Sequence, residues 1–398
     1  MSGLDRRAFL QGGAAAVGGA ALALGGVTAW DHAVSPPPPD DAVGSATVPF
    51  RGVRQAGVGT PPQAFASLLA FDLRPGVDRG ALTRLMRIWT DDIERLTQGR
   101  PALTDTEPEL ATAPARLTVT LGFGPGAFAA AGLERRRPSW LAPLPTFPVD
   151  RLQTAWSDGD LVLQVAADDP MAVAHAARLL TKEAATFVTA RWTQQGFRQA
   201  VGARPAGTTA RNLMGQVDGT VNPDPSVDAD VIWHGSDAEP WLAGSTSMVV
   251  RRIAMALDTW DRVDRTGREF TIGRRLSDGA PLTGNAEHDA PDFGAVDSLG
   301  LPVIDTAAHI RRAHATNAAE RFLRRPYNYH DPAQPAGEQT GLMFITFQRD
   351  VAAQFLPVQR RVAELDLLNQ WTTPIGSAVF WVPPGARAGT YLAQDLLA

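Results

Sequence analysis

The chain has 398 residues, of which 44% are hydrophobic and 20% charged, so it is globular and long enough for two domains or one large one. A net charge of -5 without a basic stripe argues against a nucleic-acid-binding protein. The absence of cysteine excludes disulfides, iron–sulfur clusters, thiolate metal ligands and cysteine nucleophiles.

The N-terminus has the pattern of an export signal. The paired arginines of Asp5–Leu10 are typical of a twin-arginine signal, and an Ala- and Gly-rich stretch follows from Gly12 to Gly26. We predict a signal peptide over residues 1–29, with an uncleaved N-terminal anchor as the alternative. The apolar run is broken by glycines and is too weak for a stable membrane span. The mature protein is then expected in the periplasm, in the cell envelope or outside the cell. Because this route carries folded proteins, it also favours a bound cofactor.

A linker and an N-terminal half are expected next. Consecutive prolines predict a stiff, solvated linker over residues 30–48, before an N-terminal half at 49–210. The apolar spacing in that half predicts the following elements: strands at Phe65–Leu73, Leu117–Phe123, Leu161–Val165 and Phe187–Trp192, and helices over Leu82–Leu96 and from Asp169-Pro170 onward. The order strand, helix, strand, strand, helix, strand is the ferredoxin-like arrangement.

The C-terminal half, 211–398, repeats this pattern loosely. It is predicted to contain strands at Ser247–Met255, Gly341–Gln348 and Ala378–Val382, and helices at Thr259–Arg268 and Val351–Leu365, the last with Leu365 inside. A long excursion, roughly Gly273 to Pro335, interrupts the repeat, and such insertions are usually functional. We predict an α+β fold of two ferredoxin-like halves with antiparallel sheets, barrel-like as in dimeric α+β proteins, with a cofactor beside the C-terminal half.

A glycine-bracketed acid stands at the start of the C-terminal half. Gly215 and Gly219 flank Asp218, so the backbone can bend sharply and approach a ligand while the carboxylate is presented from a loop. By itself an Asp-Gly pair is more often an ordinary turn. The motif gains meaning only from residues that follow it in the excursion.

Two histidines of the excursion compete as metal ligands. The chain has 7 histidines, and none has the spacing of a zinc site. On one helix, His309 and His314 would point about 140° apart and could not both face one metal. The residues alone leave open which of them, if either, is a ligand.

Three parts of the chain, taken in order, resemble the dye-decolourising peroxidase family of haem enzymes. They are Asp218, His309-Ile310-Arg311 and Leu323-Arg324-Arg325. The resemblance covers nearly the whole mature chain and includes these further segments: Gln55–Gly57, Asn212–Gly215, Gly273–Gly284, Asp366–Trp371 and Gly376–Gly385. They look like the exported branch, which includes deferrochelatases. Gln216 stands where the family usually has Phe, and Pro326 stands where glycine is common.

The resemblance implies one haem b per chain and assigns the residues that bind it. His309 matches the axial ligand of the iron, and Asp366 matches the carboxylate that accepts a hydrogen bond from that histidine. Arg311 is expected near a haem propionate. Gly215 and Gly219 shape the loop over the cofactor.

The resemblance also implies a peroxidase reaction with hydrogen peroxide and phenolic, dye-like or other small reductants. Asp218 matches the general acid–base that moves a proton between the two peroxide oxygens, and Arg324 stabilises the departing negative charge. A carboxylate base should favour acidic over neutral conditions. Tyr327, Tyr329 and Trp371 are candidate relays for bulky reductants.

Two alternatives remain open. A deferrochelatase-like component of an iron-uptake system would use the same residues, with iron-uptake proteins as partners. An exported binding module without haem would need none of the proposed chemistry.

Overall fold

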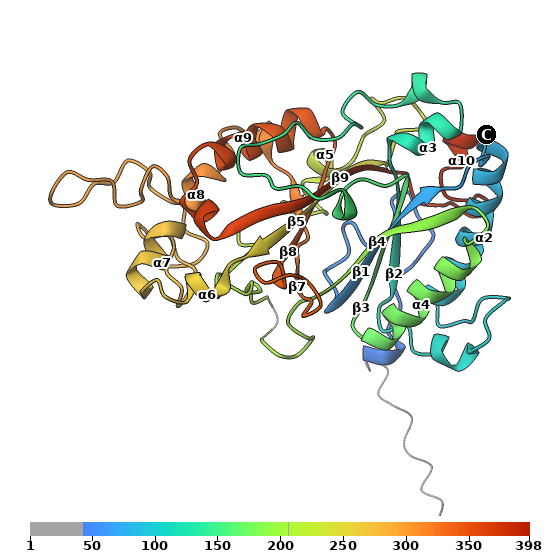
Figure 1. Ribbon diagram of the computed structural model, residues 1–398, viewed down its shortest axis with the longest axis horizontal. Helices are drawn as coiled ribbons and strands as arrows, with labels where there is room; N and C mark the ends of the chain where they lie inside the picture. Colours follow the sequence, from blue (N-terminus) through green and yellow to red (C-terminus); the bar gives the residue numbers. More distant parts are fainter. Residues whose placement is uncertain (1–42, 206) are drawn as a thin grey trace, which may run out of the picture. The chain divides into compact units, whose positions relative to one another are not determined.

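In the computed structural model, residues 43–205 and 207–398 are described, and within them nine strands form one sheet (Figure 1). The strands are β1 (Phe65–Leu73), β2 (Thr118–Phe123), β3 (Leu161–Ala167), β4 (Val188–Phe197), β5 (Thr246–Met255), β6 (Leu323–Arg324), β7 (Tyr327–His330), β8 (Thr340–Gln348) and β9 (Thr372–Val382). The predicted signal peptide, 1–29, and residues 30–42 of the predicted linker lie outside the described part of the chain.

The first four strands have the strand order β2-β3-β1-β4, all antiparallel, which is ferredoxin-like. Helices α2 (Arg79–Thr97) and α4 (Pro170–Glu183) cover one face of these strands (Figure 1). Helix α2 buries an apolar stripe that includes Leu82, Leu85 and Trp89. Asp169 caps α4 as predicted, since its carboxylate accepts the amide of Met171.

The C-terminal half has the equivalent order β9-β5-β8-β7, with β6 paired to β8 just ahead of β7. The two halves meet where Phe123 of β2 pairs with Trp381 of β9, and where Phe197 of β4 pairs with Asn328 of β7. Because β5 also pairs with β8, the strands form a closed ring. The predicted fold class is confirmed.

The remaining helices are short. They are α3 (Pro125–Ala130), α5 (Ala229–Ile232), α6 (Leu257–Trp260), α7 (Arg265–Ile272), α8 (His309–Arg312), α9 (Leu356–Leu365) and α10 (Gln394–Leu397), with 3-10 turns at Val43–Ser45, Pro108–Ala111, Glu134–Arg136, Thr154–Trp156, Ala318–Glu320 and Leu367–Gln370. Among all helices in the described residues, none has both the length and the apolarity needed to cross a bilayer.

Two helix predictions were inaccurate. The region Thr259–Arg268 holds α6 and the start of α7 rather than one helix, because Asp264 caps a new helix by accepting the amide of Gly267. The predicted helix Val351–Leu365 begins with a π-helical turn, Val351–Phe355, before α9. Leu365, predicted inside, is the last residue of α9 and is 51% exposed.

A buried acid between α2 and α4 makes stability depend on pH. Burial, followed by the neighbouring Glu183, raises the pKa of Asp92 to about 8. The folded state therefore holds a proton that the unfolded state releases near pH 4. This stabilisation is fully present below that pH and is lost as the pH rises through about 8.

We expect Asp92→Asn to remove much of this pH dependence. Between pH 5 and pH 8.5, the Tm of the wild type should fall by roughly 3–6 °C more than the Tm of the variant. Thermal unfolding at both pH values measures the effect, and Asp261→Asn is the control because the Asp261 side chain is 72% exposed. Equal pH dependence in Asp92→Asn and the wild type would contradict the assignment.

Candidate active site

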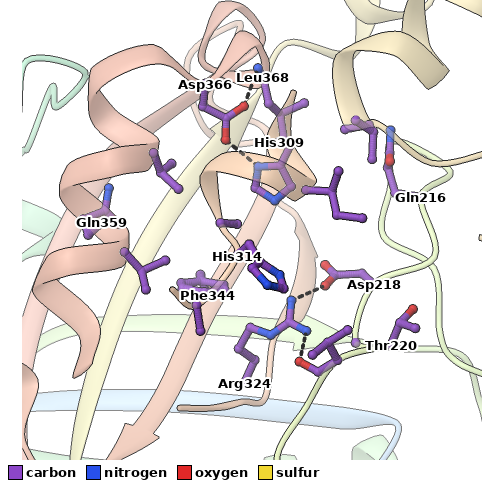
Figure 2. Close-up of a pocket in the computed structure, with 18 of the residues that line it drawn as sticks. Gln216, Asp218, Thr220, His309, His314, Arg324, Phe344, Gln359, Asp366 and Leu368 are labelled. Carbon is purple, nitrogen blue, oxygen red and sulfur yellow. Dashed lines mark hydrogen bonds and ion pairs between the residues drawn. The ribbon is translucent and has the colours of Figure 1, made fainter. Parts of the chain in front are cut away.

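A cavity of about 550 Å³ lies beside the C-terminal half (Figure 2). Its walls are mainly apolar and include Ile253 and Met255 of β5, Leu342 and Phe344 of β8, and Val358 and Val362 of α9. The volume is typical of a pocket that encloses a small molecule or cofactor. The sheet thus forms one wall of the cavity, and α9 faces it.

A buried carboxylate orients His309. Its Nδ1 donates to Oδ2 of Asp366 at 2.5 Å, and the other ring nitrogen points toward the cavity (Figure 2). The second oxygen of Asp366 accepts the amide of Leu368 at 2.8 Å. The side chain of Asp366 is 1% exposed, whereas that of His309 is 37% exposed and lines the cavity. This arrangement presents one free imidazole nitrogen to a ligand.

The charge of Asp366 also governs the protonation of His309. Burial disfavours the charged imidazole, but the Coulomb attraction and hydrogen bond of Asp366 outweigh it, so the pKa of His309 is raised. The same carboxylate therefore increases the basicity of the imidazole as a metal ligand.

Asp218 and Arg324 face the cavity together, as Figure 2 shows. Oδ1 of Asp218 lies 3.6 Å from Nη1 of Arg324, and Oδ2 is 3.4 Å from the side-chain amide of Asn212. Both contacts are long, so each group can still form hydrogen bonds with another molecule. A carboxylate and a guanidinium are thus available to a bound ligand.

Asn222 fixes the backbone of Arg324 in both directions. Its Oδ1 accepts the Arg324 amide at 2.8 Å, and its Nδ2 donates to the Arg324 carbonyl at 2.9 Å. The guanidinium is held by a further bond from Nη2 to the carbonyl of Val221 at 2.9 Å. Arg324 is therefore rigidly attached to the segment that follows Asp218.

The other predicted site residues divide into two groups. Gly219 lines the cavity, whereas Gly215, at φ +80, shapes the turn without lining it. Arg311 also lies outside the lining, and its Nη2 donates to the carbonyls of Phe293 and Ile304. In this structure, Arg311 closes the base of the loop between those two residues.

His314 and Gln216 also line the cavity. Helix α8 ends at Arg312, so the helical geometry that would have turned His314 away from His309 does not apply. No hydrogen bond of the His314 ring occurs within the described residues, and burial, followed by the charge of Arg361, lowers its pKa. The side-chain nitrogen of Gln216 is buried without a partner in the described part of the chain.

Sequence reasoning missed two further residues. Arg274 belongs to the segment Gly273–Gly284, to which the sequence assigned no role. It lines the cavity, and burial lowers its pKa. Glu287 accepts hydrogen bonds from two threonines of the Asp218 loop. A lone acid inside an irregular excursion gives no pattern that could have found Glu287.

Family models divide the chain in two. The model "Dyp-type peroxidase, N-terminal" matches residues 55–198, and "Dyp-type peroxidase, C-terminal" matches residues 209–387. The chain belongs to the Dyp-type peroxidase family. It is therefore a haem peroxidase, and haem is its cofactor.

Similar proteins cover nearly the whole chain. A dye-decolorizing peroxidase of Thermobifida fusca is 38% identical, over 99% of this chain and 97% of that protein. A deferrochelatase of Escherichia coli K12 is 36% identical over 88% of this chain and 87% of its own.

Solved structures of Dyp-type peroxidases are similar to this chain over most of its length. A DyP-type peroxidase from Cellulomonas bogoriensis is 59% identical with a TM-score of 0.87, covering 89% of this chain and 99% of that one. Ferric DtpA from Streptomyces lividans is 40% identical with a TM-score of 0.85, covering 89% and 98%.

The residues around the cavity fit a haem. One carboxylate-bound imidazole offers a nitrogen of the type that ligates haem iron, and apolar walls suit the porphyrin face. Asp218 and Arg324, which can still form hydrogen bonds with a ligand, line the same cavity. The donor set therefore suits the cofactor of the family.

Proposed function

We propose that this Dyp-type peroxidase binds one haem b through His309 and uses hydrogen peroxide to oxidise phenolic, dye-like or other small reductants. The observation that carries the proposal is the single cavity shared by His309, Asp218 and Arg324. Overall, one peroxide and two one-electron reductants that each lose a hydrogen give two waters and two oxidised products.

His309 would hold the cofactor, and Asp366 would orient its ring. Bound haem supplies the redox-active iron at which peroxide is reduced. Because Asp366 is buried and accepts both His309 and the amide of Leu368, the imidazole is fixed in one tautomer and one orientation.

Asp218 would act as general acid–base and Arg324 as the electrostatic partner. The carboxylate accepts the proton from one peroxide oxygen and delivers it to the other, so that water can leave. The Arg324 guanidinium directs free N–H groups at the negative charge that develops on the leaving oxygen. Their separation of 3.6 Å leaves each group able to contact the same small molecule.

A second candidate function is removal of iron from haem in an iron-uptake system. The observation that favours it is the similarity of this chain to several deferrochelatases, at 36–37% identity. The same cavity would serve both functions, and the relevant partners would then be iron-uptake proteins. The haem-free binding module is no longer supported, because the family is one of haem enzymes.

Spectroscopy and product analysis test these proposals. We expect haem added to the purified protein to give a Soret band that saturates at one haem per chain, and peroxide-dependent oxidation of a phenolic dye. Dye oxidation without peroxide is the control. Release of iron together with fluorescent metal-free porphyrin would favour the second candidate. A chain that gives no Soret band would exclude both.

We further propose that the protein is exported by the twin-arginine route. The paired arginines within Asp5–Leu10 support this, and an exported enzyme would meet reductants outside the cytoplasm. Fractionation of cells that express the full chain, with Arg6-Arg7 replaced by lysines as the control, measures the location.

A further inference from the structure

The loop that carries Asp218 is a narrow hairpin. Arg211 and Val217 form an isolated bridge, and the amide of Asp218 donates to the carbonyl of Ala210 at 2.9 Å. Thr209 and Thr220 therefore lie on opposite arms of the hairpin, next to the Asp218–Ala210 pair. Because the side-chain contacts of Asp218 are long, this backbone decides where its carboxylate lies.

Glu287 joins the two arms from outside the hairpin. Its Oε1 accepts the hydroxyl of Thr209 at 2.5 Å and the hydroxyl of Thr220 at 2.9 Å. Hydrogen bonds to a carboxylate are stronger than those between neutral groups. The side chain of Glu287 is 22% exposed, so solvent competes only in part. One oxygen atom therefore sets the separation of the arms beside Asp218.

The side chain of Arg274 holds the backbone of the segment that carries Glu287. Nη1 of Arg274 donates to the carbonyl of Glu287 at 2.9 Å and to that of Gly279 at 2.6 Å. Gly279 has φ +74 and packs so closely on Val217 that an added Cβ would lie 2.9 Å from its side chain. This close packing joins the excursion to the hairpin at a second point.

We propose that Glu287 is a positioning residue that holds the Asp218 hairpin through Thr209 and Thr220. The inference rests on the proposed function, in which Asp218 is the acid–base. Removing the carboxylate frees the arms, and displacement of a catalytic group by about 1 Å can cost about 100-fold in rate. Haem binding through His309 does not depend on this contact.

Four variants test the inference. Glu287→Leu removes both hydrogen bonds, Glu287→Gln keeps an accepting oxygen, Thr220→Val removes one hydroxyl at nearly constant shape, and Glu287→Leu/Thr220→Val combines two changes. We expect Glu287→Leu to lower kcat/KM for hydrogen peroxide by about 10–100-fold. Haem content and KM for the reductant should stay at wild-type values. Glu287→Gln should restore most of the rate, and the double variant should be no slower than Glu287→Leu.

Hydrogen exchange supplies a readout that is independent of turnover. The amides of residues 209–220 should exchange faster in Glu287→Leu than in the wild type or Glu287→Gln. Glu107→Leu is the matched control, since Glu107 also accepts a threonine hydroxyl, that of Thr106, but in the N-terminal half. It should change neither the rate nor exchange in this loop.

Each outcome decides between specific alternatives. Wild-type kcat/KM in Glu287→Leu overturns the inference, as do losses that multiply in the double variant. A slow Glu287→Leu beside an unaffected Asp218→Asn overturns both the inference and the acid–base role of Asp218. If Glu287→Leu does not fold, Thr220→Val decides, and a wild-type rate together with unchanged exchange in that variant overturns the inference.

Discussion

Replacement of His309 by alanine is expected to abolish stable haem binding while leaving the fold intact. His309 lies on the cavity wall and its carboxylate partner is buried, so the change removes the imidazole nitrogen directed at the cavity. Loss of an outer partner costs roughly 10–100-fold in metal affinity, and loss of the ligand itself should cost more. The Soret band per chain, after haem titration and gel filtration, measures this effect.

Two companion variants show whether His309 is the ligand. His314→Ala should keep its haem, because His314 has no carboxylate partner within the described residues. Asp366→Asn should bind haem more weakly than the wild type but better than His309→Ala. Retained haem in His309→Ala together with loss in His314→Ala would transfer the ligand role to His314.

Local pattern predicted the regular elements well, because each strand and helix of the sheet carries its own periodicity. The range of β1 was predicted residue for residue, and the cap of α4 was predicted from Asp169-Pro170. Errors arose where a helix ends or changes its period. The predicted helix at Val351–Leu365 begins with a π turn, and Leu365 at its end is exposed. The end of α8 at Arg312 leaves His314 free to line the cavity.

Contacts between distant segments could not be derived from pattern alone. His309 and Asp366 are separated by 57 positions, and Arg324 and Asn222 by 102, so no periodicity connects them. Family resemblance supplied the first pair, whereas nothing in the sequence indicated the second. Ring closure through the Phe123–Trp381 pair is likewise a property of packing between halves.

For Arg311, the position that the resemblance implies differs from the contacts in the structure. Resemblance places it near a haem propionate, and the structure has it donating to the carbonyls of Phe293 and Ile304. Its Nε is buried without a partner in the described residues, and the side chain does not line the cavity. Arg274, which does line the cavity, is a second guanidinium that sequence reasoning left without a role.

Asp218→Asn and Arg324→Leu are expected to slow peroxide turnover strongly while retaining haem. Loss of a general acid–base costs about 100–10,000-fold, and loss of a charge-stabilising donor about 100–1,000-fold. We expect kcat/KM for hydrogen peroxide to fall by these factors and KM for the reductant to stay constant. Because both groups are proposed to act in one step, the double variant should be much faster than the product of the two losses predicts. Steady-state rates at varied peroxide, normalised to haem content, measure this.

A matched ion pair in the same half separates catalysis from the general effect of removing charge. Asp237 and Arg349 pair at 2.9 Å, and the Asp237 side chain is 69% exposed. Asp237→Asn and Arg349→Leu remove the same chemical groups from the surface and should leave turnover unchanged. A wild-type rate in Asp218→Asn would remove the carboxylate from the reaction. Loss of haem in either Asp218→Asn or Arg324→Leu would instead show that these residues bind the cofactor, since a purely catalytic role leaves the His309 contact undisturbed.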